Sequence, residues 1–562
     1  MRGAAMERLS HARAVEGLSG GCRGDTTIKD MNNNVRQNGL CRRVLAACVL
    51  GAAVLPGVAD DRHRPHIVLV MLDDMGFSDL GCYGGEVETP HIDSLAAAGV
   101  RFSHFWNTGR SCPSRASLLT GCYQHDAGMG WMTAVDEHRP GYRGQVAREL
   151  PLVSDLLRSV GYRTYMSGKW HITVDGAFGR PNGTYPVERG FDRSYGSLTG
   201  GSDYWAPRFV YSGLTPVDGF PDDFYYTTAI TDSAVSFVRS HPADSPMFLY
   251  VAHYAPHRPL QAPADRVARC RARYRVGYDV LRRARFRRQQ QMGLVPKEVD
   301  LPEFDREFGG HRPAWTELTA EQQDNWVEQM ATYAAMIEIV DDGIGRLTDA
   351  LRERGMLENT VFFILSDNGA TLEGGRTNQL MADLSNTPYR SYKQWCYMGG
   401  TSSPLIVADG RAGVCLTPGR IVEDQAHITD VLPTCLDLAG MRYPGNALGV
   451  ALPGRSLWPA VRGGGLPERD FYFEHQTASA VISGQWKLVR KNEKAPWELY
   501  DLSVDPFETA DLAKKLPDVR NRLLARWESW AKEHHVLPLF DMPWGARIQY
   551  WKQRCPDQSG NN

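Results

Sequence analysis

One short stretch, Asn107–Gly121 (NTGRSCPSRASLLTG), combines residues that could carry out chemistry on an anion. A polar turn containing Gly109 leads to Ser111, and Pro113 has the fixed φ that suits a first helical turn. Ser111 is therefore expected just ahead of a helix whose unpaired N–H groups and dipole favour an anion. Arg115 adds a permanent positive charge roughly one turn further on. A small nucleophile, a helix N-terminus and an arginine together predict a reaction at an oxyanion.

Two pairs of oxygen-bearing side chains each follow a predicted buried strand, namely Asp73-Asp74 and Asp367-Asn368. In open α/β sheets, ligands gather at the carboxyl ends of strands. Either pair alone would more often form a turn or a cap, because Asp-Asn-Gly is a common turn sequence. Together they supply three carboxylates and one amide oxygen, the hard ligands that Ca²⁺ or Mg²⁺ prefers. Since burying such charge without a cation is costly, the sequence predicts a divalent-cation site.

The stretch beginning at Ser111 resembles the signature of the type I sulfatases, Cys/Ser-x-Pro-Ser-Arg, followed here by Leu119-Thr120-Gly121. In that family, part of the alkaline phosphatase superfamily, the first residue is oxidised to formylglycine, whose aldehyde hydrate is the nucleophile. The family's proline lies two positions after the modified residue, so the register selects Ser111 and makes Cys112 the spacer. A serine here resembles the bacterial, serine-type arylsulfatases matured by a radical S-adenosylmethionine enzyme. Where the family often has Arg after Thr-Gly, this chain has Cys122.

The resemblance implies roles for further residues. Lys169 and His171 match a Gly-Lys-Trp-His motif, whose lysine contacts sulfate and formylglycine and whose histidine hydrogen-bonds the hydrate. His257 matches a sulfate-contacting histidine and candidate general acid, and Lys393 matches, more loosely, a second sulfate-binding lysine. The implied catalytic residues are Ser111, Arg115, Lys169, His171, His257 and Lys393. The implied ligands of one Ca²⁺, with Mg²⁺ as the alternative, are Asp73, Asp74, Asp367, Asn368 and the group derived from Ser111.

Some family positions differ or carry no predicted chemistry. Met398-Gly399-Gly400 stands where Glu-Gly-Gly is frequent, and the Arg that often follows is absent from Thr401–Pro404, which affects the local loop. His253 has no family match, and His427 matches a mostly structural position. The implied reaction is hydrolysis of sulfate esters, of an O-sulfated carbohydrate in exo fashion or of an aryl sulfate. The loop Gly200–Trp205 is compatible with a sugar substrate.

Two other functions remain open at this point. A phosphatase or phosphodiesterase of the same superfamily would use an unmodified Ser or Thr and two zinc ions, and the Pro-Ser-Arg context speaks against it. An inactive relative could bind sulfated glycans through Arg282–Arg288. That segment belongs to Ala264–Lys297, which holds ten Arg and one Lys against two Asp. We expect this segment to be a solvated helical arm rather than a polyanion-binding surface. We also expect His475 to lie on the sugar side of the site.

The elements that must position these residues predict an α/β fold. Nearly unbroken apolar runs, as in strands buried on both faces, are His66–Leu72, Met247–Ala252, Val361–Leu365 and Pro404–Val407. Helical segments alternate with them, which indicates a large mixed, mostly parallel sheet flanked by helices, alkaline phosphatase-like by resemblance. From about Arg469, short strands and a Trp-bearing helix predict a smaller α+β domain with an antiparallel sheet. The predicted divisions are residues 1–60, 61–465 (catalytic) and 466–562.

Composition and the N-terminus indicate compartment and partners. A net charge of −2 exerts no pull toward nucleic acid or anionic membrane. The 11 cysteines show neither zinc nor disulfide spacing, and Cys82, Cys112 and Cys122 could pair or be free. Met31 is the predicted start of an export signal with an apolar core, Val44–Val58, that is short for a membrane span and ends near a cleavage site at Ala59. The mature chain is expected to be periplasmic or extracellular, without membrane insertion and without a lipid anchor.

Overall fold

The computed structural model describes residues 64–134, 136–303, 312–411 and 417–539, with 542–543, 545–546, 549 and 553. Every described residue belongs to one compact unit, Val58–Asn562. The predicted start at Met31, the signal and its cleavage site near Ala59 therefore lie outside the described residues. Among the described helices, none is both long and apolar enough to cross a membrane.

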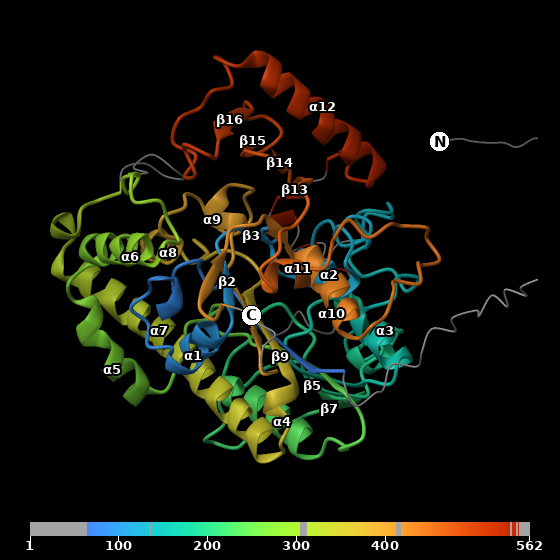
Figure 1. Ribbon diagram of the computed structural model, residues 1–562. Helices are drawn as coiled ribbons and strands as arrows, with labels where there is room; N and C mark the ends of the chain where they lie inside the picture. Colours follow the sequence, from blue (N-terminus) through green and yellow to red (C-terminus); the bar gives the residue numbers. More distant parts are fainter. Residues whose placement is uncertain are drawn as a thin grey trace, which may run out of the picture. The chain divides into compact units, whose positions relative to one another are not determined.

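A ten-stranded sheet lies at the centre of the molecule, in the order β11-β2-β10-β9-β1-β8-β4-β5-β6-β7 (Figure 1). Its strands are β1 (His66–Leu72), β2 (Val100–Phe102), β4 (Arg163–Gly168), β5 (Arg193–Ser197), β6 (Val210–Ser212), β7 (Thr215–Pro216), β8 (Met247–Ala252), β9 (Thr360–Ser366), β10 (Leu405–Asp409) and β11 (Arg420–Val422). The central strands β9, β1, β8, β4 and β5 are parallel, and β10 is antiparallel to β9. The predicted mixed, mostly parallel sheet is confirmed.

Both faces of this sheet are covered by helices, because β1 is apolar at every position after its first residue. Val68, Val70 and Leu72 belong to one buried cluster and Ile67, Leu69 and Met71 to the other, as strand alternation requires. Helices α1 (Pro90–Ala98), α4 (Tyr226–Arg239) and α7 (Ala320–Glu353) contribute to the first cluster, and α2 (Ser111–Thr120), α3 (Val153–Ser159) and α10 (Val431–Leu438) to the second. Figure 1 shows the two groups on opposite sides.

A separate four-stranded antiparallel sheet lies near the C-terminus, at the top of Figure 1. It consists of β13 (Asp470–His475), β14 (Ala478–Ser483), β15 (Trp486–Arg490) and β16 (Glu498–Asp501). Helix α12 (Pro517–Glu533) packs on it through Leu523, Trp527 and Trp530. The antiparallel sheet and its Trp-bearing helix are confirmed, while the division between residues 465 and 466 stays a prediction. The remaining helices and short strands are α5 (Ala264–Tyr274), α6 (Tyr278–Met292), α8 (Arg376–Ser385), α9 (Met398–Thr401), α11 (Trp458–Val461), β3 (Phe105–Trp106) and β12 (Ala426–His427).

The arginine-rich segment forms the helices α5 and α6, so its predicted helical structure is confirmed. The expectation that it is solvated is wrong for α6, where Arg285 is fully buried. Its guanidinium pairs with Asp79 at 2.8 Å and with Glu86 at 2.7 Å. These carboxylates lie under the helix and compensate the buried charge, which sequence alone does not reveal.

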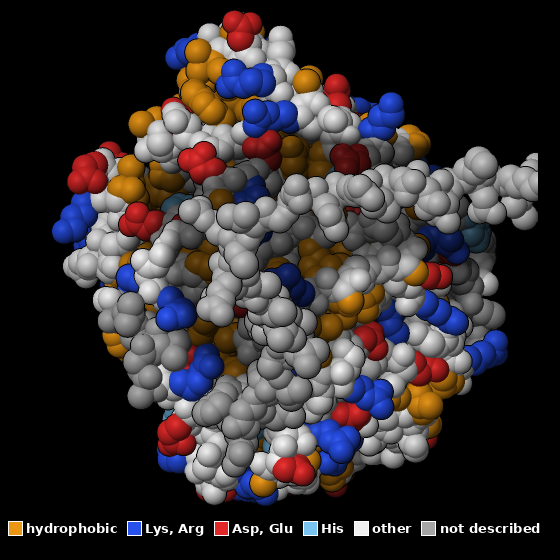
Figure 2. All heavy atoms as spheres, turned by 45° about the vertical axis from the view of Figure 1, so that its right-hand side comes forward, with side chains coloured by type: hydrophobic (Ala, Val, Ile, Leu, Met, Phe, Trp, Pro, Cys, Tyr) orange, Lys and Arg blue, Asp and Glu red, His pale blue; other side chains and the backbone are white. Residues whose placement is uncertain are grey.

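The distribution of charge on the described surface matches the small net charge, and the structure also shows the state of three cysteines. On the face shown in Figure 2, Lys and Arg side chains are interspersed with Asp and Glu over the coloured, described part. Such mixing gives that face no extended field of one sign. Within the described ranges, Cys82, Cys112 and Cys122 are all buried free thiols, which answers the question of their pairing.

Candidate active site

The carboxyl ends of two neighbouring parallel strands bring the predicted metal ligands together. Leu72 of β1 is in register with Ser366 of β9, so the residues that follow each strand are adjacent. The backbone N–H of Asp74 donates to Asp367 Oδ1 at 3.2 Å, and Asn368 Nδ2 donates to Asp74 Oδ1 at 2.7 Å. Asp73, Asp74, Asp367 and Asn368 are all buried. This cluster of four residues is called the oxygen cluster below.

Two buried oxygen atoms of the oxygen cluster are available to bind a positively charged group. Asp73 Oδ1 and Asn368 Oδ1 are buried, and neither has a hydrogen-bond partner among the described residues. Ligand atoms of Asp73, Asp74 and His257 also lie within 4.8 Å of one another. Buried oxygens without partners are rare because each costs free energy. The donor set therefore fits a hard divalent cation.

The charges of the oxygen cluster are set by burial and by two cations. Burial raises the pKa of Asp73 well above its usual value, and neighbouring Asp367 raises it further. Burial also acts to raise the pKa of Asp367, but Arg115 and Lys169 outweigh it and lower that pKa to about 2. Asp367 is therefore a carboxylate at neutral pH, as a metal ligand must be.

Ser111 lies beside the oxygen cluster at the start of α2. It is the first residue of the helix, with Arg110 in the N-cap position, rather than just ahead of it. Its Oγ accepts a hydrogen bond from Arg115 Nε at 3.1 Å and lies 3.3 Å from His171 Nδ1. The neighbouring Cys112 points elsewhere, with its thiol 3.4 Å from the carbonyl of Trp131. Of these two neighbours, only Ser111 faces the other candidate residues.

Arg115 connects the predicted nucleophile to the oxygen cluster. Its side chain is fully buried, and its three nitrogens have separate partners. Besides Nε, which binds Ser111, Nη1 donates to the backbone oxygen of Lys169 at 3.0 Å and Nη2 to Asp367 Oδ2 at 3.1 Å. A guanidinium is the one side chain that can hold three such partners at fixed angles. Arg115 thus orients Ser111 relative to Asp367.

Two buried lysines flank the oxygen cluster. Lys169 Nζ donates to Asp73 Oδ2, and Lys393 Nζ lies 2.9 Å from Asp74 Oδ1. Burial lowers the pKa of Lys169. Burial also acts to lower the pKa of Lys393, but Asp74 and Glu373 outweigh it and raise that pKa. Two ammonium groups beside a cation site form a suitable pocket for an oxyanion.

Both predicted histidines have a lowered pKa, but they turn different nitrogens toward the site. Burial lowers the pKa of His171 well below its usual value, and Lys169 and Arg115 lower it further, so His171 is neutral at pH 7. His257 Nδ1 lies 2.5 Å from the backbone oxygen of Arg258, so Nδ1 carries a hydrogen, and Nε2 is 3.7 Å from Asp74 Oδ2. Burial lowers the pKa of His257 to about 4, although Asp74 opposes the shift. Nε2 is therefore the His257 nitrogen that faces the site.

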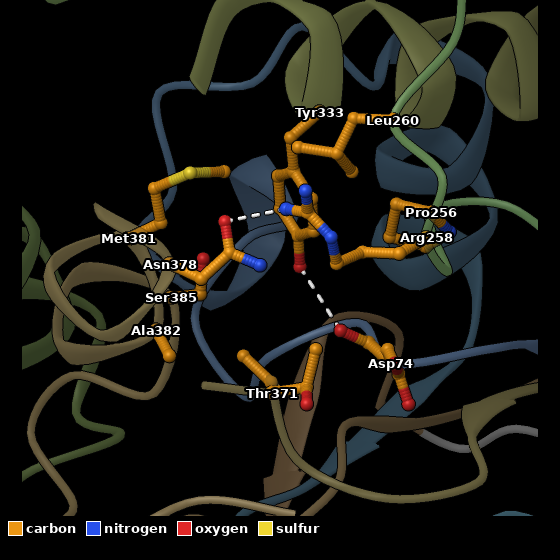
Figure 3. Close-up of a pocket in the computed structure, with 11 residues that line it drawn as sticks. Asp74, Pro256, Arg258, Leu260, Tyr333, Thr371, Asn378, Met381, Ala382 and Ser385 are labelled. Atoms are coloured by element: carbon orange, nitrogen blue, oxygen red, sulfur yellow. Dashed lines mark hydrogen bonds between the residues drawn. The ribbon is translucent and has the colours of Figure 1, made fainter. Parts of the chain in front are cut away.

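A small cavity of about 20 Å³ lies behind Asp74 (Figure 3). This volume suits about one water molecule. Figure 3 shows Tyr333 above Asp74, with its hydroxyl 3.2 Å from the Asp74 backbone oxygen. Arg258 Nη1 donates to Asn378 Oδ1 at 2.6 Å across the same cavity. The Tyr333 hydroxyl therefore supports the backbone of Asp74 at this cavity.

Sequence reasoning missed residues that touch the predicted ones. Arg110 Nη1 lies 2.9 Å from Glu373 Oε1, and Glu373 Oε2 lies 3.3 Å from Lys393 Nζ. The only available signal was that Arg110 precedes Ser111, because Glu373 lies in a loop without a recognised motif. His475 lies in β13 and is completely buried, and its expected place on the sugar side stays a prediction.

The loop Gly200–Trp205 lies against both predicted histidines. A Cβ atom added to Gly200 would be 2.4 Å from His171 Nε2, and one added to Gly201 would be 3.1 Å from His257 Cε1. Glycine is therefore required where this loop approaches the site. The loop is positioned to contact whatever the histidines contact.

Comparisons with known proteins agree with this geometry. The Sulfatase family model matches residues 65–441. An uncharacterized sulfatase of Schizosaccharomyces pombe is 31% identical over 535 residues, covering 84% of this chain and 94% of that protein. An arylsulfatase of Klebsiella aerogenes is 30% identical, covering 71% and 92%. The solved structure of Ps i-CgsB in complex with k-i-k-neocarrahexaose has a TM-score of 0.63 at 24% identity, covering 88% and 98%, and shows the shared fold. The chain belongs to the sulfatase family, and its reaction is the hydrolysis of sulfate esters.

Proposed function

We propose that this protein hydrolyses sulfate esters of carbohydrates with a formylglycine derived from Ser111 and one bound Ca²⁺. The observation that carries the proposal is the position of Ser111 Oγ, 3.1 Å from Arg115 Nε and 3.3 Å from His171 Nδ1. A buried side chain held between an arginine and a neutral histidine, beside an oxygen cluster, is placed for nucleophilic chemistry. The formylglycine hydrate would supply the attacking hydroxyl and a second hydroxyl through which sulfate can leave.

The proposed cation would be held by Asp73, Asp74, Asp367, Asn368 and the group at position 111. The partnerless oxygens of Asp73 and Asn368 support this assignment, and the all-oxygen set favours Ca²⁺, with Mg²⁺ as the alternative. When bound, the cation would neutralise negative charge on the sulfate and on the attacking oxygen.

The chain's own residues would bind and orient the sulfate. Lys169 and Lys393 reach the oxygen cluster from two sides and would donate to sulfate oxygens. Arg115 would fix the direction of the attacking oxygen, because its other two nitrogens are anchored to Lys169 and Asp367. The attacking oxygen therefore loses most of its conformational freedom when the chain folds, rather than during the reaction.

Two histidines would move the protons. His257 holds its Nδ1 hydrogen on the Arg258 backbone oxygen, so Nε2 is the nitrogen that faces the site. Nε2 would first take up a proton from solvent, favoured by the negative charge of Asp74 and of the bound sulfate, and would then pass it to the leaving alcohol. His171 is neutral and faces position 111, so its Nδ1 would accept a proton as sulfate departs. Both roles follow from which nitrogen faces the site.

We further propose an exported, carbohydrate-directed enzyme. The predicted signal between Met31 and Ala59 supports export, and a serine at position 111 supports maturation by a radical S-adenosylmethionine enzyme. The oligosaccharide bound by Ps i-CgsB, which shares the fold, and the loop Gly200–Trp205 beside the histidines support a sugar substrate. We propose exo action, in which the terminal sulfated sugar enters the site.

Peptide mass spectrometry of natively matured protein tests the proposal. Trypsin cleavage after Arg110 and Arg115 releases Ser111–Arg115. We expect this peptide to be lighter by two hydrogens, or to appear as the hydrate, and to react with an aldehyde probe. Unmodified serine in active, full-length protein would refute the formylglycine mechanism.

A further inference from the structure

A carboxylate lies beside Lys393, one of the two lysines that the proposed function assigns to sulfate binding. Glu373 Oε1 is 2.9 Å from Arg110 Nη1, and its Oε2 is 3.3 Å from Lys393 Nζ. The same Lys393 Nζ is 2.9 Å from Asp74 Oδ1. Glu373 is therefore separated from the oxygen cluster by a single lysine.

Glu373 is also the most exposed member of this group. Its side chain is 42% exposed, whereas those of Arg110 and Lys393 are 7% and 3% exposed. His257 is 16% exposed. Glu373 thus lies at the rim, where the buried charges of the site meet solvent and where the rest of a substrate would extend.

The backbone of Glu373 is fixed on both sides. Its N–H donates to Thr371 Oγ1 at 3.0 Å, and its carbonyl accepts a hydrogen bond from Asn378 Nδ2. Gly374 follows with a φ of +103°, and a Cβ there would lie 2.7 Å from the Arg258 guanidinium carbon. Figure 3 shows Thr371 and Asn378 at the cavity beside Asp74, with Asn378 bonded to Arg258. The carboxylate is consequently held at a set place near the site.

We propose that Glu373 is a specificity-determining residue, whose carboxylate accepts a hydrogen bond from a donor group next to the sulfate ester. Such a group is a hydroxyl or an amide N–H on the sulfated ring. A substrate with a second anionic group at that place is disfavoured. The proposal rests on the proposed function and adds which substrate groups are accepted next to the sulfate ester.

The size of this discrimination follows from the geometry. Lys393 Nζ lies 3.3 Å from Glu373 Oε2, so the separation between the Glu373 carboxylate and an anion beside a sulfate bound by this lysine is taken as roughly 5 Å. At that distance and an effective dielectric constant of about 20, like charges change binding by more than about a hundredfold. Because Glu373 is partly exposed and paired with Arg110, we expect about tenfold.

Matched substrates and variants test the proposal on full-length, matured enzyme. The substrates are 4-nitrophenyl sulfates that carry an ortho carboxamide or an ortho carboxylate, two groups of similar shape and different charge. We expect the ratio of their kcat/KM values, amide over acid, to be about tenfold higher for the native enzyme than for Glu373→Gln. Glu373→Asp retains the charge and should retain the preference. Glu358→Gln removes an exposed carboxylate before β9, at the opposite end of that strand, and should leave the ratio unchanged.

Arg110→Gln provides a second measurement if Glu373→Gln does not fold. Removing the cation leaves the Glu373 charge less compensated, so the amide-over-acid ratio should rise. An equal ratio in native enzyme and Glu373→Gln, or an unchanged ratio in Arg110→Gln, overturns the inference. Unsubstituted 4-nitrophenyl sulfate distinguishes failure of the inference from failure of the proposed function, because its turnover shows that sulfate hydrolysis itself is intact. If formylglycine-bearing enzyme hydrolyses neither these three substrates nor a sulfated sugar, the proposed function and the inference both fail.

Discussion

Arg285 offers a sharp test of whether the arginine-rich segment is structural. Its Nε and Nη2 each donate to Glu86 at 2.7 Å, and its Nη1 donates to Asp79 at 2.8 Å. The Arg285 side chain that makes these contacts is 0% exposed. Arg285→Met keeps a long side chain but removes the charge, which leaves Asp79 without its cation and Glu86 with only Arg288, at 3.6 Å.

The expected loss follows from the cost of breaking a buried ion pair, about 3–5 kcal/mol. Unfolding entropy near 60 °C is about 2.1 cal/mol/K per residue, so about 500 folded residues give roughly 1 kcal/mol/K. Dividing the two gives a Tm lower by about 3–5 °C. The measurement is thermal unfolding followed by fluorescence at a fixed heating rate.

Arg283→Met is the matched control, because Arg283 lies on the same helix and is exposed. It should shift the Tm by less than about 1 °C, since exposed charges contribute little. Both variants remove one positive charge, so a role in binding sulfated glycans would weaken retention on a sulfated polysaccharide column in both. Equal Tm values for Arg285→Met and the native protein would refute the structural role.

Three further predictions concern the site and acid stability. Ser111→Ala should lower kcat for 4-nitrophenyl sulfate by at least about 10³-fold, because no nucleophile remains, while the protein still folds. Chelation of divalent cations by EDTA should abolish activity and lower the Tm. If the cation was present at 100 times its Kd, the free energy of unfolding should fall by about 3 kcal/mol. Adding Ca²⁺ should restore both activity and Tm. Burial and then Arg469 lower the pKa of His427 to about 3. The unfolded chain therefore takes up a proton that the folded chain refuses, and stability falls as pH drops below about 6.5, by about 2 kcal/mol at pH 5. His427→Asn, whose amide oxygen can replace Nδ1 as acceptor for the Thr429 N–H, should lose that part of the acid sensitivity in denaturant titrations.

Each of these has an outcome that would contradict it. Sulfatase turnover retained by purified Ser111→Ala would remove Ser111 from the mechanism. Protein shown by elemental analysis to be metal-free, yet active and equally stable, would refute the cation site. An unchanged difference in unfolding free energy between pH 7.5 and pH 5 in His427→Asn would show that His427 does not contribute to acid sensitivity.

The core strands were predictable from sequence because their signal is local. Apart from its first residue, His66–Leu72 is apolar, as is Met247–Ala252, and the structure gives both the predicted bounds. The oxygen cluster could also be anticipated, since parallel neighbouring strands place the residues after them at one edge. These successes required only the pattern along the chain and a general rule about sheets.

The contacts of the charged residues could not be predicted in the same way. Arg282, Arg285 and Arg288 have similar neighbours in sequence, yet Arg285 is fully buried and Arg288 is half-buried. Arg285 pairs with both Asp79 and Glu86, which lie about two hundred residues away, whereas Arg288 reaches only Glu86, at 3.6 Å. The pairing of Arg110 with Glu373 is equally distant in sequence. Composition reports the number of charges, while their partners depend on the tertiary fold.

The same distant contacts determine how the oxygen cluster is built. Asp74 has a φ of +66°, a left-handed conformation that costs a non-glycine residue about 1–3 kcal/mol. It is held there by its N–H bond to Asp367 and by the Tyr333 hydroxyl, which lies 3.2 Å from its carbonyl and 2.6 Å from Asp79 Oδ2. Asp79 is in turn the partner of Arg285. A helix whose arginines suggested exposure to solvent therefore supports, through Asp79 and Tyr333, the backbone of a residue proposed to bind the cation. Local sequence rules fail for Asp74 and Arg285 because each adopts its state only through the others.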